Sequence, residues 1–185
     1  MALGAGAHGR IQYDRMKGET PAMQVHLLRH GIAEDGHTGM PDGDRALTSE
    51  GRKRLRQVLQ TAAKAGVKPT LILSSPLKRA LQTAEVAKRT FGYQGQIVHT
   101  KALAPGSSVE QVWEEIRAHR DEGSLLLTGH NPQFEHLAGF LLGHSNLKID
   151  FKKGAILRVD IESFGAEPRG ILRWCLTAKL AESGG

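Results

Sequence analysis

Two arginines and two histidines of this 185-residue chain stand in short motifs whose residue types suit phosphoryl chemistry. The motifs are Arg29-His30-Gly31, Ser75-Pro76-Leu77-Lys78-Arg79 and Gly129-His130-Asn131-Pro132. Guanidinium groups bind a tetrahedral dianion through forked N–H donors, and a neutral imidazole is a good nucleophile near pH 7. If the three motifs meet in space, they therefore form a site that binds phosphate and attacks phosphorus.

Each of the four side chains has an expected role in such a site. His30 would attack phosphorus in line and become a phosphohistidine, and water would then release phosphate. Arg29, Arg79 and His130 would bind the phosphate and stabilise the charge on its oxygens. Because these four side chains can take the place of a metal, and because the chain has no Gly-x-x-x-x-Gly-Lys loop, we expect neither a metal nor a cofactor.

The elements that must position these motifs alternate between strand and helix patterns. Short runs rich in leucine and β-branched residues predict four strands: Gln24–Arg29, Thr70–Ser74, Gln96–Thr100 and Ser124–Thr128. Each is followed by apolar residues at helical spacing, and four capping signals mark the expected helix starts: Thr48, Ser75-Pro76, a capping box over Ser107–Glu110, and Asn131-Pro132.

Four strand–helix pairs predict an α/β fold, with three α/β/α layers and a mostly parallel central sheet. Two alternating segments, Ala155–Ile161 and Gly170–Thr177, predict a terminal antiparallel strand pair. In open α/β sheets, ligands bind beyond the carboxyl ends of the strands. The three motifs follow the first, second and fourth strands, so we expect them at one edge, where helix N-termini add free N–H groups for an anion.

Composition excludes several protein classes. Apolar residues make up 39% and charged residues 24%, which is typical of a globular domain rather than a disordered, collagen-like or coiled-coil chain. The single cysteine, Cys175, excludes a disulfide framework and favours a reducing, cytoplasmic compartment. No apolar run approaches the roughly 18 residues of a membrane span. Residues 1–22 lack any periodicity and are interpreted as a disordered leader or tag remnant, with one domain over residues 23–185.

The formal net charge of +6 favours anionic partners. The densest basic run, Arg52 to Arg56, carries no aromatic stacking platform, so we expect no nucleic-acid partner and no membrane partner. The sequence does not indicate an oligomeric state.

The segments LLRHG, SSPLKRALQTA and LLTGHNP resemble three signatures of the histidine phosphatase superfamily, also called the phosphoglycerate mutase-like family. The resemblance extends over nearly the whole chain from Met23 and is strongest to the short SixA-type phosphohistidine phosphatases, which lack a large inserted cap. It implies a phosphoglycerate mutase-like fold, with His30 as the phosphorylated nucleophile and His130 as the second pocket histidine. It also implies that Arg29 and Arg79 bind phosphate.

The resemblance leaves the proton donor for the leaving group open. Larger, mutase-like members use a carboxylate from a region inserted after the second helix, and this chain has almost no insertion there. The candidates are Glu34, Asp35, Asp42, Asp44 and Glu110. A phosphoramidate nitrogen leaves far more easily than an alkoxide, so the absence of a clear acid weakly favours a phosphohistidine substrate.

The sequence therefore predicts a metal-independent phosphatase that acts through a phosphohistidine intermediate, with phosphohistidine in a protein as the favoured substrate. A phosphatase of a small phosphorylated metabolite is the first alternative, and a phosphate-binding module with little turnover is the second. Mutase activity is disfavoured, because the chain has no spare residues for a lid that shields a phosphoenzyme from water.

Overall fold

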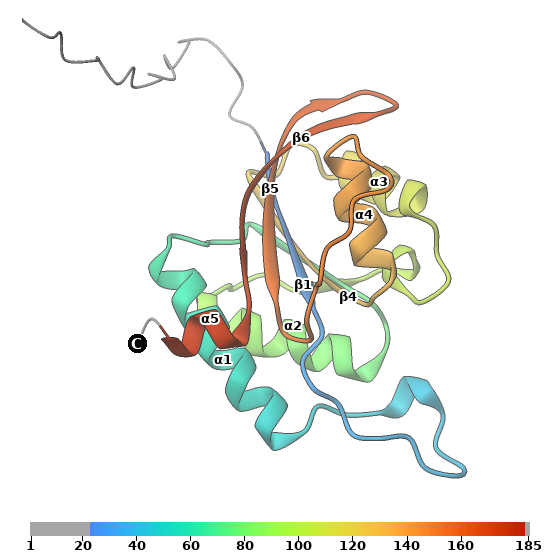
Figure 1. Cartoon of the computed structure of the whole chain (residues 1–185), viewed down its shortest axis with the longest axis vertical. Coiled ribbons are helices and arrows are strands. Elements are labelled where there is room, and N and C mark those ends of the chain that lie inside the picture. The colour runs from blue at the N-terminus through green and yellow to red at the C-terminus, as the bar shows by residue number, and fades with distance from the viewer. Residues whose placement is uncertain (1–22, 184–185) are drawn as a thin grey trace, which may run out of the picture.

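A central six-stranded sheet with helices on both faces organises the computed structural model, which describes residues 23–183 (Figure 1). The expectation for residues 1–22 lies outside this range. The strands are β1 (Met23–Arg29), β2 (Leu71–Ser74), β3 (Ile97–His99), β4 (Ser124–Gly129), β5 (Ile156–Phe164) and β6 (Pro168–Leu176). The helices are α1 (Ser49–Lys64), α2 (Lys78–Phe91), α3 (Val109–Ala118), α4 (Gln133–Leu141) and α5 (Ala178–Ser183), with 3-10 turns η1 (Asp42–Asp44) and η2 (Lys101–Leu103).

The strand order is β3-β2-β4-β1-β5-β6. The first four strands of the chain pair in parallel, β5 runs antiparallel to β1, and β6 runs antiparallel to β5. The predicted α/β fold, with its mostly parallel sheet and terminal antiparallel pair, is therefore confirmed. Because β1, β2 and β4 are parallel neighbours in this order, their carboxyl ends lie at the same edge of the sheet.

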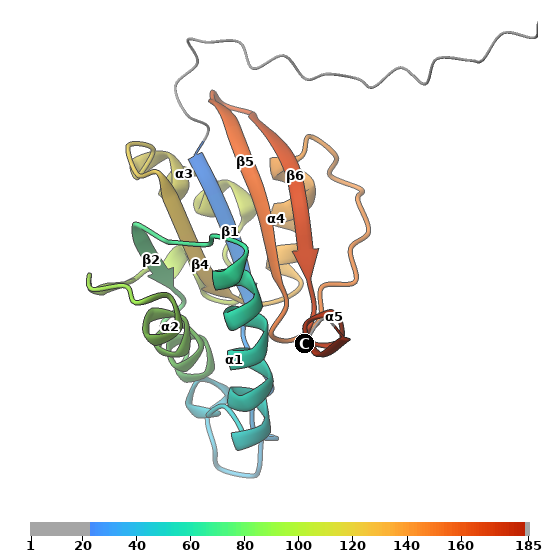
Figure 2. The same ribbon diagram turned by 90° about the vertical axis from the view of Figure 1, so that its left-hand side faces the viewer.

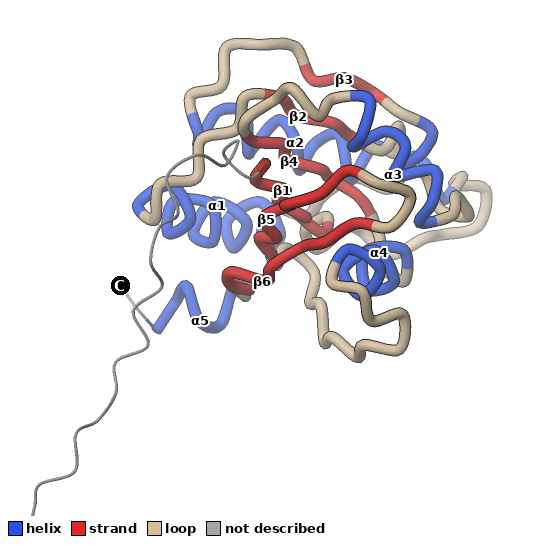
Figure 3. Tube along the Cα trace, turned by 90° about the horizontal axis from the view of Figure 1, so that it is seen from above, coloured by secondary structure: helices blue, strands red, loops and turns tan. Residues whose placement is uncertain are grey.

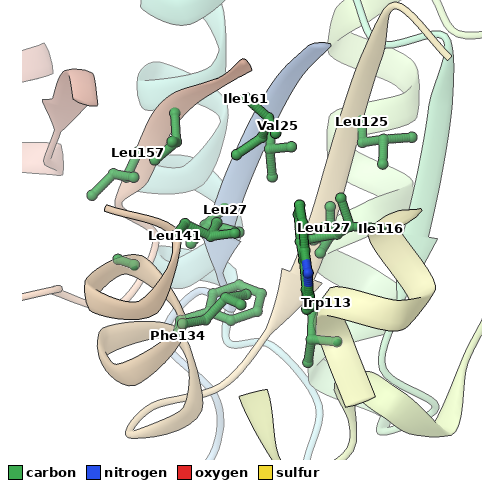
Figure 4. Packing of buried hydrophobic residues seen from close by; sticks show 14 of the residues in the cluster. Val25, Leu27, Trp113, Ile116, Leu125, Leu127, Phe134, Leu141, Leu157 and Ile161 are labelled. Atoms are coloured by element: carbon green, nitrogen blue, oxygen red, sulfur yellow. The ribbon is translucent and has the colours of Figure 1, made fainter. Parts of the chain in front are cut away.

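Helices cover both faces of the sheet, as Figures 2 and 3 show. Side chains alternate along a strand, so Leu125 and Leu127 pack in the cluster that includes α3 and α4, whereas Leu126 packs in the cluster that includes α1, α2 and α5. Burial on both faces explains why β4 reads as an uninterrupted apolar run. Figure 4 shows the first cluster, in which Trp113 and Phe134 are fully enclosed.

Two of the predicted helix starts are wrong, because the side chains expected to cap these helices make other contacts instead. Helix α2 begins at Lys78 with Leu77 as its N-cap residue, so Ser75-Pro76 lies before the helix. The Ser75 hydroxyl is 2.8 Å from Nε2 of His130. Helix α4 begins at Gln133. The side chain of Asn131 donates to the Phe151 carbonyl and to Glu135, and does not cap the helix.

The other two caps agree more closely with prediction. The Thr48 hydroxyl accepts the Gly51 N–H and caps α1, as predicted. The capping box of α3 lies one residue later than expected and joins Ser108 to Gln111, because the Ser107 hydroxyl donates to the Lys101 carbonyl instead. Helix α5 was not predicted, and its six residues pack against α1. No helix between residues 23 and 183 has the length and apolar content needed to cross a membrane.

Gly51 allows α1 to begin directly against the segment that follows β1. A Cβ atom at this position would lie 2.2 Å from the carbonyl oxygen of Ile32, which accepts the Thr48 N–H at 3.0 Å. This oxygen belongs to the backbone, so it cannot rotate away as a flexible side chain would. The close approach explains why glycine occupies the first turn of a helix despite its low helix propensity.

We therefore expect Gly51→Ala to lower the free energy of unfolding by about 1–3 kcal/mol, as overpacking typically does. Urea denaturation followed by circular dichroism would measure the loss. Gly123→Ala is the matched control, because nothing lies within 4 Å of a Cβ atom there, and its stability should be equal or higher. Equal stability of the two variants would contradict the close approach of α1.

Candidate active site

The three motifs begin at the same level of the sheet edge. Arg29 at the end of β1 is in register with Gly129 at the end of β4. The ladder continues beyond the strands, because the His30 N–H donates to the Gly129 carbonyl and the Ser75 N–H donates to the Thr128 carbonyl, each at 3.0 Å. The backbone thus holds all three motifs in place before any of their side chains makes a contact.

His30 is 9% exposed, and one hydrogen bond defines its neutral form. Its Nδ1 lies 2.8 Å from the Gly31 carbonyl oxygen. Because a carbonyl only accepts, Nδ1 carries the hydrogen and Nε2 keeps its lone pair. Burial, together with the charges of Arg79, Arg29 and Lys153, lowers the pKa of His30 to about 4, so the ring is neutral at pH 7.

His130 faces His30 from the end of β4. The two ring centroids are 5.1 Å apart, and the planes are tilted by 55°. Nε2 of His130 lies 2.8 Å from the Ser75 hydroxyl, and the ring is 3% exposed. Burial and the charges of His30 and Arg79 lower the pKa of His130 to about 3. Both imidazoles are therefore neutral hydrogen-bonding groups near pH 7.

Oxygen atoms of other segments hold both arginines. Arg79, in the first turn of α2, is 6% exposed and donates from Nη1 to the Asp42 carbonyl at 2.7 Å and from Nη2 to the Asp42 carboxylate at 2.9 Å. Arg29 donates from Nη1 to the Phe151 carbonyl. Each guanidinium retains further N–H groups, so both can still bind an anion.

Thr83 links the nucleophile's loop to α2, and its part was not predicted from the sequence. Its hydroxyl accepts the Gly31 N–H at 3.2 Å and donates to the Arg79 carbonyl at 2.8 Å. Thr83 follows Arg79 by one helical turn, and that spacing inside the ALQTA segment was the available signal. The residue that orients the His30 ring is thus held by the helix that carries Arg79.

The loop between α4 and β5, residues 142–155, is a second contribution that sequence reasoning missed. Its Phe151 carbonyl accepts from both Arg29 and Asn131. The Gly154 N–H lies 3.2 Å from the Arg29 carbonyl oxygen and 3.0 Å from that of His30. No local motif marks these contacts, because those with Arg29 and His30 join residues more than a hundred positions apart, and that with Asn131 joins residues 20 positions apart.

Unpaired polar atoms gather at this edge. Among the residues that the structure describes, five buried side-chain polar atoms have no hydrogen-bond partner. Four of them belong to the motif residues or their neighbours: Arg29 Nε, His130 Nδ1, Asn131 Oδ1 and Gln133 Oε1. An unpaired buried polar group costs about 1–3 kcal/mol, so such a concentration indicates a site built for a polar ligand.

The candidate proton donors are not equally placed. Asp42 contacts Arg79, and hydrogen bonds from Arg45 and Arg79 lower the pKa of its carboxyl group, so it is ionised at neutral pH. The Glu110 carboxylate is held by Ser108 at the start of α3, which lowers its pKa as well. Glu34, Asp35 and Asp44 are exposed or half-exposed loop residues. Among residues 23–183, no group of three or more His, Cys, Asp or Glu side chains is arranged to hold a metal ion.

The chain is similar to known proteins in sequence and in fold. The family model described as "Histidine phosphatase superfamily (branch 1)" matches residues 25–122. An uncharacterized protein from Picosynechococcus sp. is 34% identical over 139 residues, which are 73% of this chain and 83% of that protein. 6-Phosphofructo-2-kinase/fructose-2,6-bisphosphatase 4 of Rattus norvegicus is 28% identical over 60% of this chain and 23% of its own length. A structure of the protein histidine phosphatase SixA complexed with tungstate superposes with a TM-score of 0.76 and 25% identity, covering 85% of this chain and 98% of that one.

The lowered histidine pKa values predict how stability depends on pH. His26 and His30, each with a pKa of about 4, and His130, with a pKa of about 3, bind a proton less readily when folded than in the unfolded chain, where the value is 6.5. The unfolded state therefore binds more protons as the pH falls below about 6.5. We expect the histidine contribution to the free energy of unfolding to be complete above that pH. The free energy of unfolding should then decrease towards pH 4, by up to about 1.4 kcal/mol per pH unit for each histidine.

Urea denaturation at a series of pH values would measure this decrease. His26→Gln and His130→Asn should each reduce the slope, because each removes one buried imidazole. An unfolding free energy that is constant between pH 7 and pH 5 would contradict the neutral, buried state of the three rings.

Proposed function

Because the chain belongs to the histidine phosphatase superfamily (branch 1) and is therefore a phosphatase, we propose that it hydrolyses phosphohistidine in proteins through a phosphorylated His30. The observation that carries the proposal is the His30 ring. The Gly31 carbonyl holds its Nδ1 hydrogen, so Nε2 keeps the lone pair, and the ring lies 5.1 Å from that of His130 and within the field of Arg79. A neutral imidazole fixed in one tautomer among cations is an activated nucleophile for phosphorus.

In the first step, Arg29, Arg79 and His130 bind the phosphoryl group, and the Nε2 lone pair of His30 attacks phosphorus in line. The new N–P bond forms as the bond to the leaving group breaks, and the leaving group departs with the electron pair. The cationic side chains stabilise the charge on the phosphoryl oxygens. In the second step, water attacks phospho-His30, the N–P bond breaks, and inorganic phosphate is released as His30 regains its lone pair.

The chemistry of the leaving group favours phosphohistidine over a phosphate ester. The carboxylate of Asp42 forms a salt bridge with Arg79 and is ionised, so it is poorly suited to donate a proton. An imidazole departs from a phosphoramidate with far less acid assistance than an alkoxide needs. The structural similarity to a protein histidine phosphatase supports the same substrate class.

A small phosphorylated metabolite is the second candidate substrate. The observation in its favour is the 28% identity to a protein named as a fructose-2,6-bisphosphatase, of which this chain spans 23%.

We expect His30→Ala to lower the hydrolysis of a chromogenic aryl phosphate by at least about a thousandfold, because it removes the nucleophile. In the native protein, a phosphoenzyme trapped by rapid quenching should be stable in alkali and labile in acid, and it should be absent from His30→Ala. His136→Ala is the control, since His136 is exposed on α4, and it should retain full activity. Activity that survives in His30→Ala would disprove the mechanism, and loss of activity in EDTA would show that a metal is required.

A substrate panel separates the two substrate classes. We expect kcat/KM for a phosphohistidine peptide to exceed that for sugar phosphates and nucleotides by at least about tenfold, because the leaving-group nitrogen needs little proton donation. Steady-state release of inorganic phosphate would measure both. A higher kcat/KM on a small phosphate ester would replace the protein phosphatase with a metabolite phosphatase.

A further inference from the structure

A cavity of about 430 Å³ lies beside the segment that carries His30. Its walls come from α1, from the start of α5, from the residues just before β5, and from Gly31 and Ile32 after β1. Helices α1 and α5 lie side by side in Figures 1 and 2. Ile32 and Ala178, which are only half-buried, give the cavity an apolar floor, whereas the lining residues Leu55 and Val58 are fully buried. Its volume lies within the range of ligand-binding pockets.

The rim of this cavity is basic. Four cationic side chains and one carboxylate line it: Arg54, Lys152, Lys153, Lys179 and Asp150. Two of the cations have carboxylate partners, Arg54 with Glu50 at 2.6 Å and Lys152 with Asp150 at 2.8 Å. Among the described residues, no carboxylate oxygen lies within 4.0 Å of Lys153 or Lys179. The rim therefore carries two uncompensated positive charges above an apolar floor.

The cavity and the nucleophile share one stretch of backbone. Gly31, directly after His30, forms part of the cavity wall, and so does Gly154, whose N–H donates to the His30 carbonyl at 3.0 Å. Lys153 belongs to both places, because it lines the cavity and its charge also acts on the His30 ring. The cavity wall begins one residue after His30, which puts the cavity beside any protein segment whose phosphohistidine is bound there.

We propose that this cavity binds an acidic segment of the substrate protein that flanks its phosphohistidine, and that it thereby selects substrates. The proposal rests on the proposed function. The carboxylates of the segment pair with Lys179 and Lys153, and an apolar side chain beside them covers Ile32 and Ala178. A free phosphate or a sugar phosphate would leave the apolar floor unused, whereas a peptide with acidic and apolar residues fits both features.

The test compares three substrates: a short peptide with phosphohistidine flanked by leucine and glutamates, the same peptide with glutamines in place of the glutamates, and a chromogenic aryl phosphate. The variant is Lys179→Glu, which reverses a charge on the rim at an exposed position in the first turn of α5. The matched control is Lys68→Glu, which makes the same change at an exposed site just before β2, at the opposite edge of the sheet.

We expect the native protein to have a KM at least about fivefold lower for the glutamate peptide than for the glutamine peptide, with similar kcat. Lys179→Glu should remove this preference, Lys68→Glu should keep it, and both variants should hydrolyse the aryl phosphate at the native rate. Equal KM values for the two peptides in the native protein, or a preference that survives in Lys179→Glu, would overturn the docking site and leave the phosphatase intact. If neither peptide is hydrolysed while the aryl phosphate is, the proposed phosphohistidine substrate is wrong, and the docking proposal falls with it.

Discussion

The hydrogen bond from Nδ1 of His30 to the Gly31 carbonyl, at 2.8 Å, is the interaction on which the rest of the site depends. It decides which ring nitrogen holds the lone pair, and only that nitrogen can attack phosphorus. The carbonyl can play this part because Gly31 is itself fixed, through its N–H, by the Thr83 hydroxyl. Thr83 in turn bonds to the Arg79 carbonyl, so His30, the proposed nucleophile, and Arg79, a proposed phosphate ligand, are held by the same helix, α2.

The second constraint is electrostatic. Two guanidinium groups and two imidazoles share a small buried volume, and this is tolerable because burial keeps both imidazoles neutral, with pKa values of about 4 and 3. If the rings were protonated, the site would hold several adjacent cations and its nucleophile would be lost. The Asp42 carboxylate, bonded to Arg79 at 2.9 Å, offsets part of the remaining charge. A dianionic phosphoryl group would offset it more fully, which is a physical reason for the site to bind one.

The loop of residues 142–155 connects the chemistry to the choice of substrate. On one side, its Phe151 carbonyl and Gly154 N–H hold the backbone and side chains at the end of β1. On the other side, the same loop forms part of the basic cavity beside α1 and α5. Within residues 23–183 no long segment is inserted after α2, so the neighbouring loops and the cavity are the described surfaces that can distinguish one phosphorylated partner from another.

The amino-acid sequence alone was enough to predict the order of the strands along the chain, the α/β class and the placing of the four motif side chains at one edge. Those properties follow from the periodicity of apolar residues along the chain and from the residues directly after each strand, so they depend on local sequence. Only the tertiary structure decided that Ser75 contacts His130 instead of capping α2, that Asp42 holds Arg79, and that Phe151 holds Arg29. The last two contacts span 37 and 122 positions in the chain, and no spacing rule within one element reaches so far. They depend on how the sheet and loops close around the site, because polar side chains bond to whichever partners packing brings within hydrogen-bond distance.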